Sequence, residues 1–167
     1  ADAAPAVRLV GSGTILREVI AAAEMLSADW NQPCEVWSAT SFSELARDAR
    51  EAERWNRLHP SQAPRVSHLG HCLAGDTPVV AATDYVAAWP QLVAPYLDAP
   101  FTALGTDGFG RSDTRNALRR FFEVDRQHVV IAALRALQKR GVVDAGVVES
   151  ALQRYGIDVG AAAPWSR

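Results

Sequence analysis

Residues 6–26 read AVRLVGSGTILREVIAAAEML, and this stretch decides the fold. The apolar run at residues 6–11 ends in glycine, which is typical of a buried strand. A short link, Ser12-Gly13-Thr14, follows it. Apolar residues then recur at the spacing of one face of a helix, at Ile15, Val19, Ala22, Ala23 and Leu26. The stretch therefore predicts a strand that passes through a tight turn into an amphipathic helix.

The same alternation continues along the chain. Short apolar runs predict further strands at residues 34–39, 78–82 and 101–104. Helices are predicted over residues 41–57, 66–73, 83–96, 114–122, 125–140 and 144–155, with Ser41 opening an S-x-x-E capping box and Pro90 opening or kinking its helix. Alternating strands and helices favour an α/β fold, a three-layer domain with a mostly parallel sheet of four to five strands. A fifth strand would have to lie in the 60s or in the tail.

Length and composition bound the function. The chain has 167 residues and a formal net charge of -2, with no block of like charge. This balance argues against nucleic acid or an anionic membrane as the main partner, and no apolar run reaches the ~20 residues that span a bilayer. Residues 1–5 lack the pattern of a signal peptide and are expected to be a linker, so we expect one domain, residues 1–167, cut from a longer protein. The two cysteines, Cys34 and Cys72, are expected to be reduced, buried thiols in a cytoplasmic protein.

Residues 104–115, LGTDGFGRSDTR, are the most conspicuous loop. Three glycines, two aspartates, two arginines and a phenylalanine lie between the last predicted strand and a helix. Glycine permits positive φ angles and close approach of backbone. A loop of this composition between rigid elements predicts a binding or contact surface.

Three candidate sites have simpler structural alternatives. A phosphate could lie at the turn Gly11-Ser12-Gly13-Thr14, but the third glycine of a dinucleotide fingerprint is absent, so a tight turn is favoured. His68, His71 and Cys72 could begin a zinc site, but no second cluster completes four ligands, and packing histidines are favoured. Ser112 has no base to activate it; Ser112 or Asp113 is expected to cap the next helix instead.

No catalytic, cofactor-binding or metal-binding set is therefore complete in this chain. An isolated enzyme would be expected to show a nucleophile with its base, a metal set or a cofactor loop. The five tryptophans are scattered, and we expect them in the core and between domains rather than in a ligand cage. The residues alone favour a domain that does not itself catalyse a reaction.

The chain resembles the C-terminal domain of the homodimeric bacterial pyruvate dehydrogenases, which belong to the transketolase-like superfamily. The resemblance covers nearly the whole chain and rests on several motifs in order. The motifs are LVGSGTILR at 9–17, TSFSELARD at 40–48, ERWNRLHP at 53–60, TDY at 83–85, LGTDGFGRSD at 104–113 and FEVD at 122–125.

This resemblance implies an enzyme of three α/β domains in the bacterial cytoplasm. Thiamine diphosphate, with Mg²⁺, would lie between the first two domains, which bind its diphosphate and its pyrimidine. The enzyme would decarboxylate pyruvate and reductively acetylate the lipoyl group of its partner, the dihydrolipoamide acetyltransferase component. The residues for these tasks would lie in the other two domains, so none is assigned to this chain.

The resemblance also gives the conspicuous loop a role. We expect it at the carboxyl end of the sheet, where Asp107, Gly108, Phe109, Gly110, Arg111, Ser112 and Asp113 would contact a neighbouring domain or subunit. The alternatives are the same domain of a 2-oxobutyrate dehydrogenase or a transketolase-like enzyme, and a module that binds the acyltransferase or a regulator. Such a module would use the loop or the charged helix at residues 43–57. An independent small-molecule enzyme is the least favoured interpretation.

Overall fold

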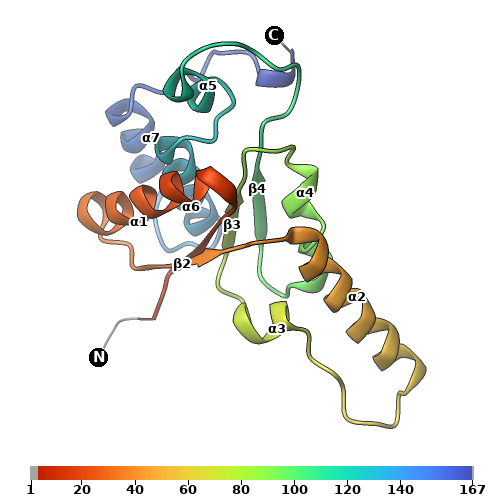
Figure 1. Ribbon diagram of the computed structural model, residues 1–167. Coiled ribbons are helices and arrows are strands. Elements are labelled where there is room, and N and C mark those ends of the chain that lie inside the picture. The colour runs from red at the N-terminus through yellow and green to blue at the C-terminus, as the bar shows by residue number, and fades with distance from the viewer. Residues whose placement is uncertain (1–3, 167) are drawn as a thin grey trace.

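Four parallel strands form the centre of the computed structural model, which describes residues 4–166. The strands are β1 (Val7–Gly11), β2 (Cys34–Ser38), β3 (Val79–Ala82) and β4 (Phe101–Leu104), in the spatial order β2-β1-β3-β4 (Figure 1). Leu9 of β1 is in register with Val36 of β2 and Val80 of β3. The predicted parallel α/β sheet is confirmed, and the described residues contain no fifth strand. Residues 1–3 of the predicted linker lie outside the described residues.

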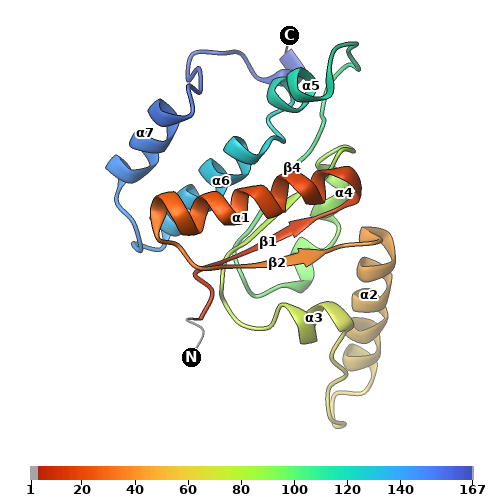
Figure 2. The ribbon, with the colours of Figure 1, turned by 60° about the vertical axis from the view of Figure 1, so that its left-hand side comes forward.

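Helices cover both faces of the sheet, so the predicted three layers are present (Figures 1 and 2). One layer contains α1 (Leu16–Trp30) and α6 (Arg126–Lys139), with α7 (Ala145–Arg154) packed on α6. The other contains α2 (Phe42–Leu58), α3 (His68–Cys72) and α4 (Ala88–Gln91). Beyond the carboxyl end of β4 lies α5 (Arg115–Phe121). Short 3₁₀ turns are η1 (Gly13–Ile15), η2 (Ala94–Tyr96) and η3 (Pro164–Ser166).

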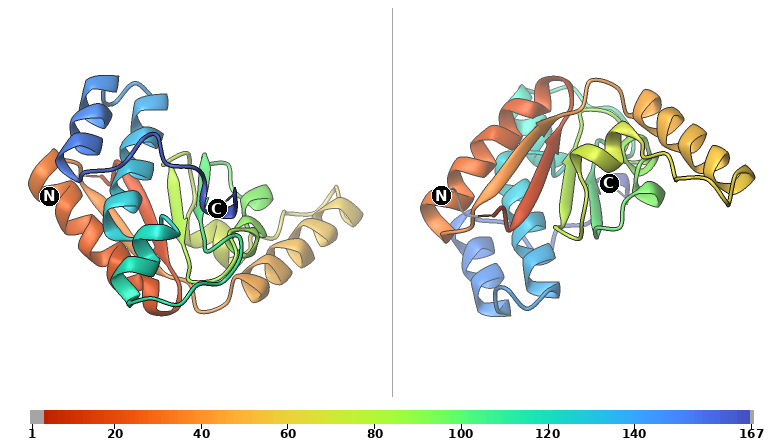
Figure 3. Two further views of the ribbon diagram at one scale, coloured as in Figure 1. Left: turned by 90° about the horizontal axis from the view of Figure 1, so that it is seen from above. Right: turned by 90° about the horizontal axis from the view of Figure 1, so that it is seen from below.

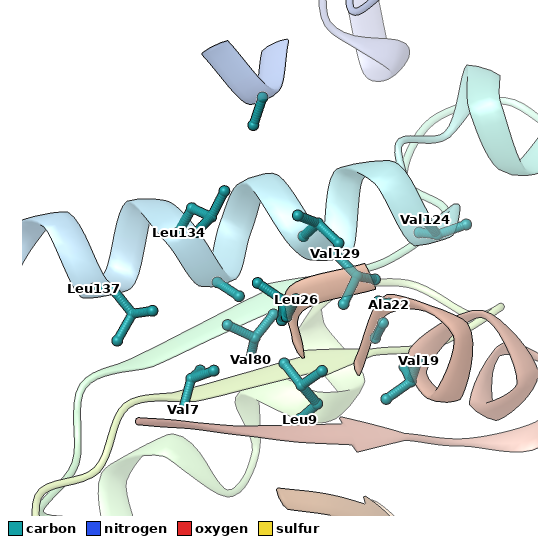
Figure 4. Close-up of a cluster of buried hydrophobic side chains, with 14 of the residues drawn as sticks. Val7, Leu9, Val19, Ala22, Leu26, Val80, Val124, Val129, Leu134 and Leu137 are labelled. Carbon is teal, nitrogen blue, oxygen red and sulfur yellow. The ribbon is translucent and has the colours of Figure 1, made fainter. Parts of the chain in front are cut away.

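Two hydrophobic cores lie on the two faces, because successive side chains of a strand point in opposite directions. Leu9 and Val80 point into the larger core under α1 and α6, whereas Val10 and Val79 point into the smaller core. Figure 4 shows the larger core, in which Leu26 of α1 and Leu137 of α6 lie against the strands. Burying a side chain of this size contributes about 1.5–3 kcal/mol.

The smaller core supports only the first half of α2. Phe42, Ala46 and Ala49 are buried, but the helix then runs away from the sheet and the chain returns through an exposed segment (Figure 3). We call residues 50–66 the arm. Its shape is held by its own contacts rather than by the core.

Side-chain caps open several of the helices. Ser41 Oγ accepts a hydrogen bond from the Glu44 backbone nitrogen at 3.3 Å, as the capping box predicts. The Glu44 carboxylate does not complete the box, because it accepts from Arg47 instead. Asp125 and Asp144 cap α6 and α7 through their side chains.

Three predictions about local structure are wrong. The predicted helix at residues 83–96 is only α4 and η2, because Pro90 and Pro95 lack backbone N–H groups and residues 83–86 bond to the loop after β4. Ser112 and Asp113 do not cap α5; Thr114 does, accepting from the Ala117 nitrogen at 3.3 Å. Cys34 and Cys72 are free thiols as predicted, but half-buried rather than buried.

No helix among residues 4–166 is both long and apolar enough to cross a membrane.

Candidate interaction site at the carboxyl edge of the sheet

The chain leaves three neighbouring strands at one edge of the sheet. The segments after β1, β3 and β4 meet there, below α5. β1 connects to β2 on one side and β3 connects to β4 on the other, so the connections diverge between β1 and β3. Open parallel sheets usually present their binding crevices at such a point. We call residues 105–114, which follow β4 at this edge, the edge loop.

The first part of the edge loop is fixed to the segment after β3. Thr106 donates its backbone N–H to the Tyr85 carbonyl at 2.8 Å, and Asp107 Oδ1 accepts from the Ala87 nitrogen at 3.2 Å. A methyl group added at Gly105 would lie 2.3 Å from that same Ala87 nitrogen, so only glycine fits this close approach. Asp107 thus has a partner within the chain.

The rest of the edge loop projects into solvent. Gly108 has a φ of +101°, and a side chain there would also meet the backbone of Trp165. Phe109, directly after it, is 87% exposed. The Arg111 guanidinium lies over the Phe121 ring, 4.4 Å from its centre, and exposed Asp113 accepts from the Thr114 nitrogen at 2.6 Å. The structure therefore presents Gly108 to Asp113 on the surface together, as one stretch.

Exposed aromatic side chains come from the segments that contact the edge loop. Tyr85, Trp89 and Trp165 are 58%, 42% and 65% exposed, and Tyr85 meets Trp89 edge-to-face with ring centres 5.7 Å apart. We call these three residues and Phe109 the aromatic rim. Large apolar groups gathered on one surface mark interaction sites, and Tyr, Trp and Phe are enriched in protein interfaces.

The turn after β1 is bonded to the segment after β3. Ser12 Oγ donates to Thr83 Oγ1 at 2.8 Å, and Thr14 Oγ1 donates to Asp84 Oδ2 at 3.1 Å. A side chain at Gly11 would lie 2.7 Å from the Leu16 Cα, so glycine lets the helix pack closely on the strand. A side chain at Gly13 would lie 3.2 Å from Asp84 Oδ1, so this carboxylate occupies the space beside the turn that a phosphate bound to it would need. The geometry therefore favours the tight turn.

The histidine and cysteine residues do not form a larger cluster. His68 Nε2 lies 3.5 Å from Cys72 Sγ on α3. Among residues 4–166, no group of three or more histidine, cysteine, aspartate or glutamate side chains is placed to hold a metal ion. Burial raises the pKa of the Cys34 thiol, which keeps it protonated at neutral pH.

A buried ionic cluster, which sequence reasoning missed, joins α1 to α5 and α6. Glu18 is only 4% exposed; one carboxylate oxygen lies 2.8 Å from Arg119 Nη1 and the other 2.9 Å from Arg126 Nε. Burial alone would raise the pKa of Glu18, but hydrogen bonds from Arg126 and the charge of Arg119 outweigh it, so the pKa lies below its ordinary value. The sequence did contain a signal for this cluster. Glu18 lies three residues after Ile15 and four before Ala22, so its carboxylate falls on the apolar face of α1, where a buried charge needs a partner.

A second cluster surrounds the start of α6. Asp125 Oδ1 accepts from the His128 backbone nitrogen at 2.9 Å and lies 2.6 Å from His128 Nδ1, while Arg120 lies 3.5 Å from Oδ2. Arg120 also donates to the carbonyls of Tyr155 and Gly156 after α7. Burial would raise the pKa of Asp125, but His128 and Arg120 lower it below its ordinary value. We call the Glu18 and Asp125 clusters together the polar junction.

Comparison with known proteins identifies the family. The family model described as the transketolase-like C-terminal domain matches residues 1–125. The chain belongs to this family. The matched residues include the whole sheet, the edge loop and Asp125, so the fold and the candidate site both lie within the family's domain.

Full-length relatives extend this result. The pyruvate dehydrogenase E1 components of Cupriavidus necator, Pseudomonas aeruginosa and Escherichia coli K12 are 49%, 51% and 50% identical over 93%, 94% and 91% of this chain. The chain spans only 17–18% of the length of these relatives. The predicted resemblance to bacterial pyruvate dehydrogenases is confirmed.

A solved structure agrees on the fold. A chain of a split-gene transketolase, described as an inactive beta4 tetramer, superposes with a TM-score of 0.54 at 20% identity, over 79% of this chain and 39% of that one. The transketolase-like C-terminal domain described here therefore has the arrangement of strands that its family assignment predicts. At this identity the likeness concerns the fold alone.

Proposed function

We propose that this chain is the C-terminal domain of a bacterial pyruvate dehydrogenase and that its edge loop joins it to the rest of the enzyme. The enzyme would decarboxylate pyruvate on thiamine diphosphate and pass the acetyl group to the lipoyl group of the acyltransferase component, in the cytoplasm. Identity of about 50% to three pyruvate dehydrogenase E1 components, across nearly all of this chain, supports the assignment.

The exposure of the edge loop is the observation that supports its role as a contact surface. Phe109 is 87% exposed although it is aromatic, and the other members of the aromatic rim, which belong to segments that contact the edge loop, are exposed as well. Leaving such a group in water forgoes the stabilisation that its burial would give, about 1.5–3 kcal/mol. A neighbouring domain or subunit that covers Gly108 to Asp113 would recover it and would pair Arg111 and Asp113.

Substitution of Arg111 by Ala in the full-length enzyme tests this role. We expect weaker dimers in sedimentation, lower turnover of pyruvate, or both. Arg135→Ala is the matched control, because Arg135 is exposed on α6 and its guanidinium donates to Gln138 of the same helix. Sedimentation and turnover that stay at the wild-type level in the Arg111 variant would refute the proposal.

We propose that thiamine diphosphate and Mg²⁺ bind to the other domains and not to this one. The described residues hold no cluster of three potential metal ligands, which supports this division. Calorimetry of the chain with thiamine diphosphate and Mg²⁺ should give no binding heat. Tight binding by the chain alone would place the cofactor here instead.

The choice of 2-oxo acid would be made in the other domains. A 2-oxobutyrate dehydrogenase or another transketolase-like enzyme would use a domain like this one. Comparing kcat/KM for pyruvate and 2-oxobutyrate in the full-length enzyme separates these possibilities. A higher value for 2-oxobutyrate would replace pyruvate in the proposal.

A second candidate function, binding of the acyltransferase component, is favoured by the arm. The Trp55 ring lies between the stacked His59 ring, 4.4 Å away, and the Arg65 guanidinium, 4.2 Å away. Asn56 and Arg65 exchange two further hydrogen bonds, of 2.9 and 2.7 Å. These contacts hold the arm in one shape away from the core, as a surface for a partner requires.

Capture of the acyltransferase component by the immobilised chain tests this second function. We expect Trp55→Ala, which removes the centre of the stack, to lose the capture, while Glu149→Ala on α7 keeps it. If wild-type chain retains no acyltransferase at micromolar protein, this domain serves assembly only.

A further inference from the structure

A hollow of about 320 Å³ lies at the carboxyl edge of the sheet, between η1 and α5. Its walls come from the segments after β1, β3 and β4, so it occupies the point where the strand connections diverge. This volume is near the lower end for small-molecule sites, which hold about 300–1,000 Å³. The candidate site described above forms only one side of it.

One wall of the hollow is cationic. Arg111 of the edge loop and Arg115, the first residue of α5, both line it, and neither forms an ion pair among residues 4–166. The ring of Phe121 holds the Arg111 guanidinium in place. Arg119, further along the wall, is already bound to Glu18. Two guanidinium groups are thus free for an oxyanion, which they bind through paired, charge-assisted hydrogen bonds.

The opposite wall accepts hydrogen bonds. Thr14 donates to Asp84 Oδ2 and Thr106 donates to the Asp84 carbonyl, so both hydroxyls are oriented by the same residue. The second carboxylate oxygen of Asp84 accepts no hydrogen bond among residues 4–166. Hydroxyl or amino groups of a ligand would donate to this oxygen. The hollow therefore has cationic hydrogen-bond donors on one wall and a carboxylate acceptor on the other.

We infer that the hollow binds an oxyanion, a phosphate or a carboxylate, on Arg111 and Arg115. A free ligand would be a small phosphorylated or carboxylated molecule with hydroxyl groups that face Asp84. In the longer enzyme, the same chemistry could come from an aspartate or glutamate side chain of a neighbouring domain. This second source rests on the proposed function of the edge loop, whereas binding by the chain alone does not.

Amide NMR spectra of the ¹⁵N-labelled chain test the inference at the level of single residues. Titration with inorganic phosphate should shift the amides of Thr106, Gly108 and Gly110, which line or flank the hollow. Replacing both arginines, Arg111→Gln with Arg115→Gln, should weaken phosphate binding at least tenfold. The spread of the other amide signals reports whether this variant remains folded.

Two further variants sharpen the result. The pair Arg135→Gln with Lys139→Gln removes the same charge from exposed positions on α6 and should leave phosphate binding unchanged. Asp84→Asn should reduce the preference for glycerol 3-phosphate over inorganic phosphate severalfold. A double lysine variant, Arg111→Lys with Arg115→Lys, keeps the charge and should retain part of the affinity.

The two sources are separated by repeating the phosphate titration on the full-length enzyme. Binding that persists there indicates a free ligand, whereas binding that disappears, with dimers weakened by Arg115→Glu, indicates a side chain of a neighbouring domain. The inference is overturned if phosphate shifts no amide at the hollow, or if the arginine-to-glutamine pair binds phosphate like the wild type. Neither of those results depends on the activity or the assembly of the enzyme.

Discussion

The polar junction and the edge loop use the same kinds of side chain in opposite ways. Glu18 in the junction has a side chain that is 6% exposed and lies between two arginines. Arg111 and Asp113 in the loop are exposed, and neither forms an ion pair among residues 4–166. Charges whose partners lie within the chain hold its helices together. Charges that are left without such partners, beside exposed aromatic rings, are available to another molecule or domain.

Removing Glu18 should have the largest effect on stability. Glu18→Ala leaves Arg119 and Arg126 without their shared carboxylate, and breaking a buried pair costs about 3–5 kcal/mol. Urea unfolding of the chain measures this loss. Glu24→Ala, on the exposed side of the same helix, should cost less than about 0.5 kcal/mol. Equal losses in the two variants would mean that Glu18 does not tie the helices together.

Removing Asp125 should have the next largest effect. Asp125→Ala loses both the cap of α6 and the contact with Arg120, which we expect to cost about 2 kcal/mol. Asp144→Ala removes a cap of the same type from α7, but an exposed one, and should cost about 1 kcal/mol. Urea unfolding of the two variants would contradict this ranking if the Asp144 variant were the less stable.

Acid should weaken the polar junction. The pKa values of Glu18 and Asp125 lie below their ordinary values of 4.5 and 3.8 in the folded chain. Their stabilisation is therefore present above those ordinary values and is lost as the pH falls through the lowered pKa values. The free energy of unfolding should fall as the pH drops below about 4.5. Glu18→Gln should show a shallower fall, and an unchanged slope would exclude Glu18 as a source.

The edge loop should contribute least to the stability of the chain. Phe109→Ser removes an aromatic ring that is already 87% exposed, so the free energy of unfolding should change by less than about 0.5 kcal/mol. In the full-length enzyme the same substitution should weaken dimers measurably in sedimentation. A large loss of stability in the isolated chain would instead assign Phe109 to its own fold.

Sequence reasoning located the elements because their signals are local. The strand-turn-helix of residues 6–26 and the cap at Ser41 depend on neighbouring residues, and the structure contains both. The prediction of a helix at residues 83–96 was wrong because it relied on the helical spacing of aromatic residues. The backbone there is instead determined by Pro90 and by the long-range hydrogen bond from Thr106 to Tyr85.

The site was predicted in part for the same reason. The glycines and charges of the edge loop are visible in the sequence, and its place after the last strand follows from the order of the elements. The polar junction was missed because Glu18 meets Arg119 and Arg126 across about a hundred residues of chain. The hollow was also missed, since it needs the segments after three separate strands.

Hydrogen–deuterium exchange of the chain alone and within the full-length enzyme tests the central claim most directly. We predict that the amides of Gly108 to Asp113 exchange rapidly in the chain and are strongly protected in the enzyme. The amides of Arg126 and His128, which bond to Glu18 and Asp125, should be protected equally in both. Rapid exchange of the edge loop in both forms would contradict its proposed role as the contact between this domain and the rest of the enzyme.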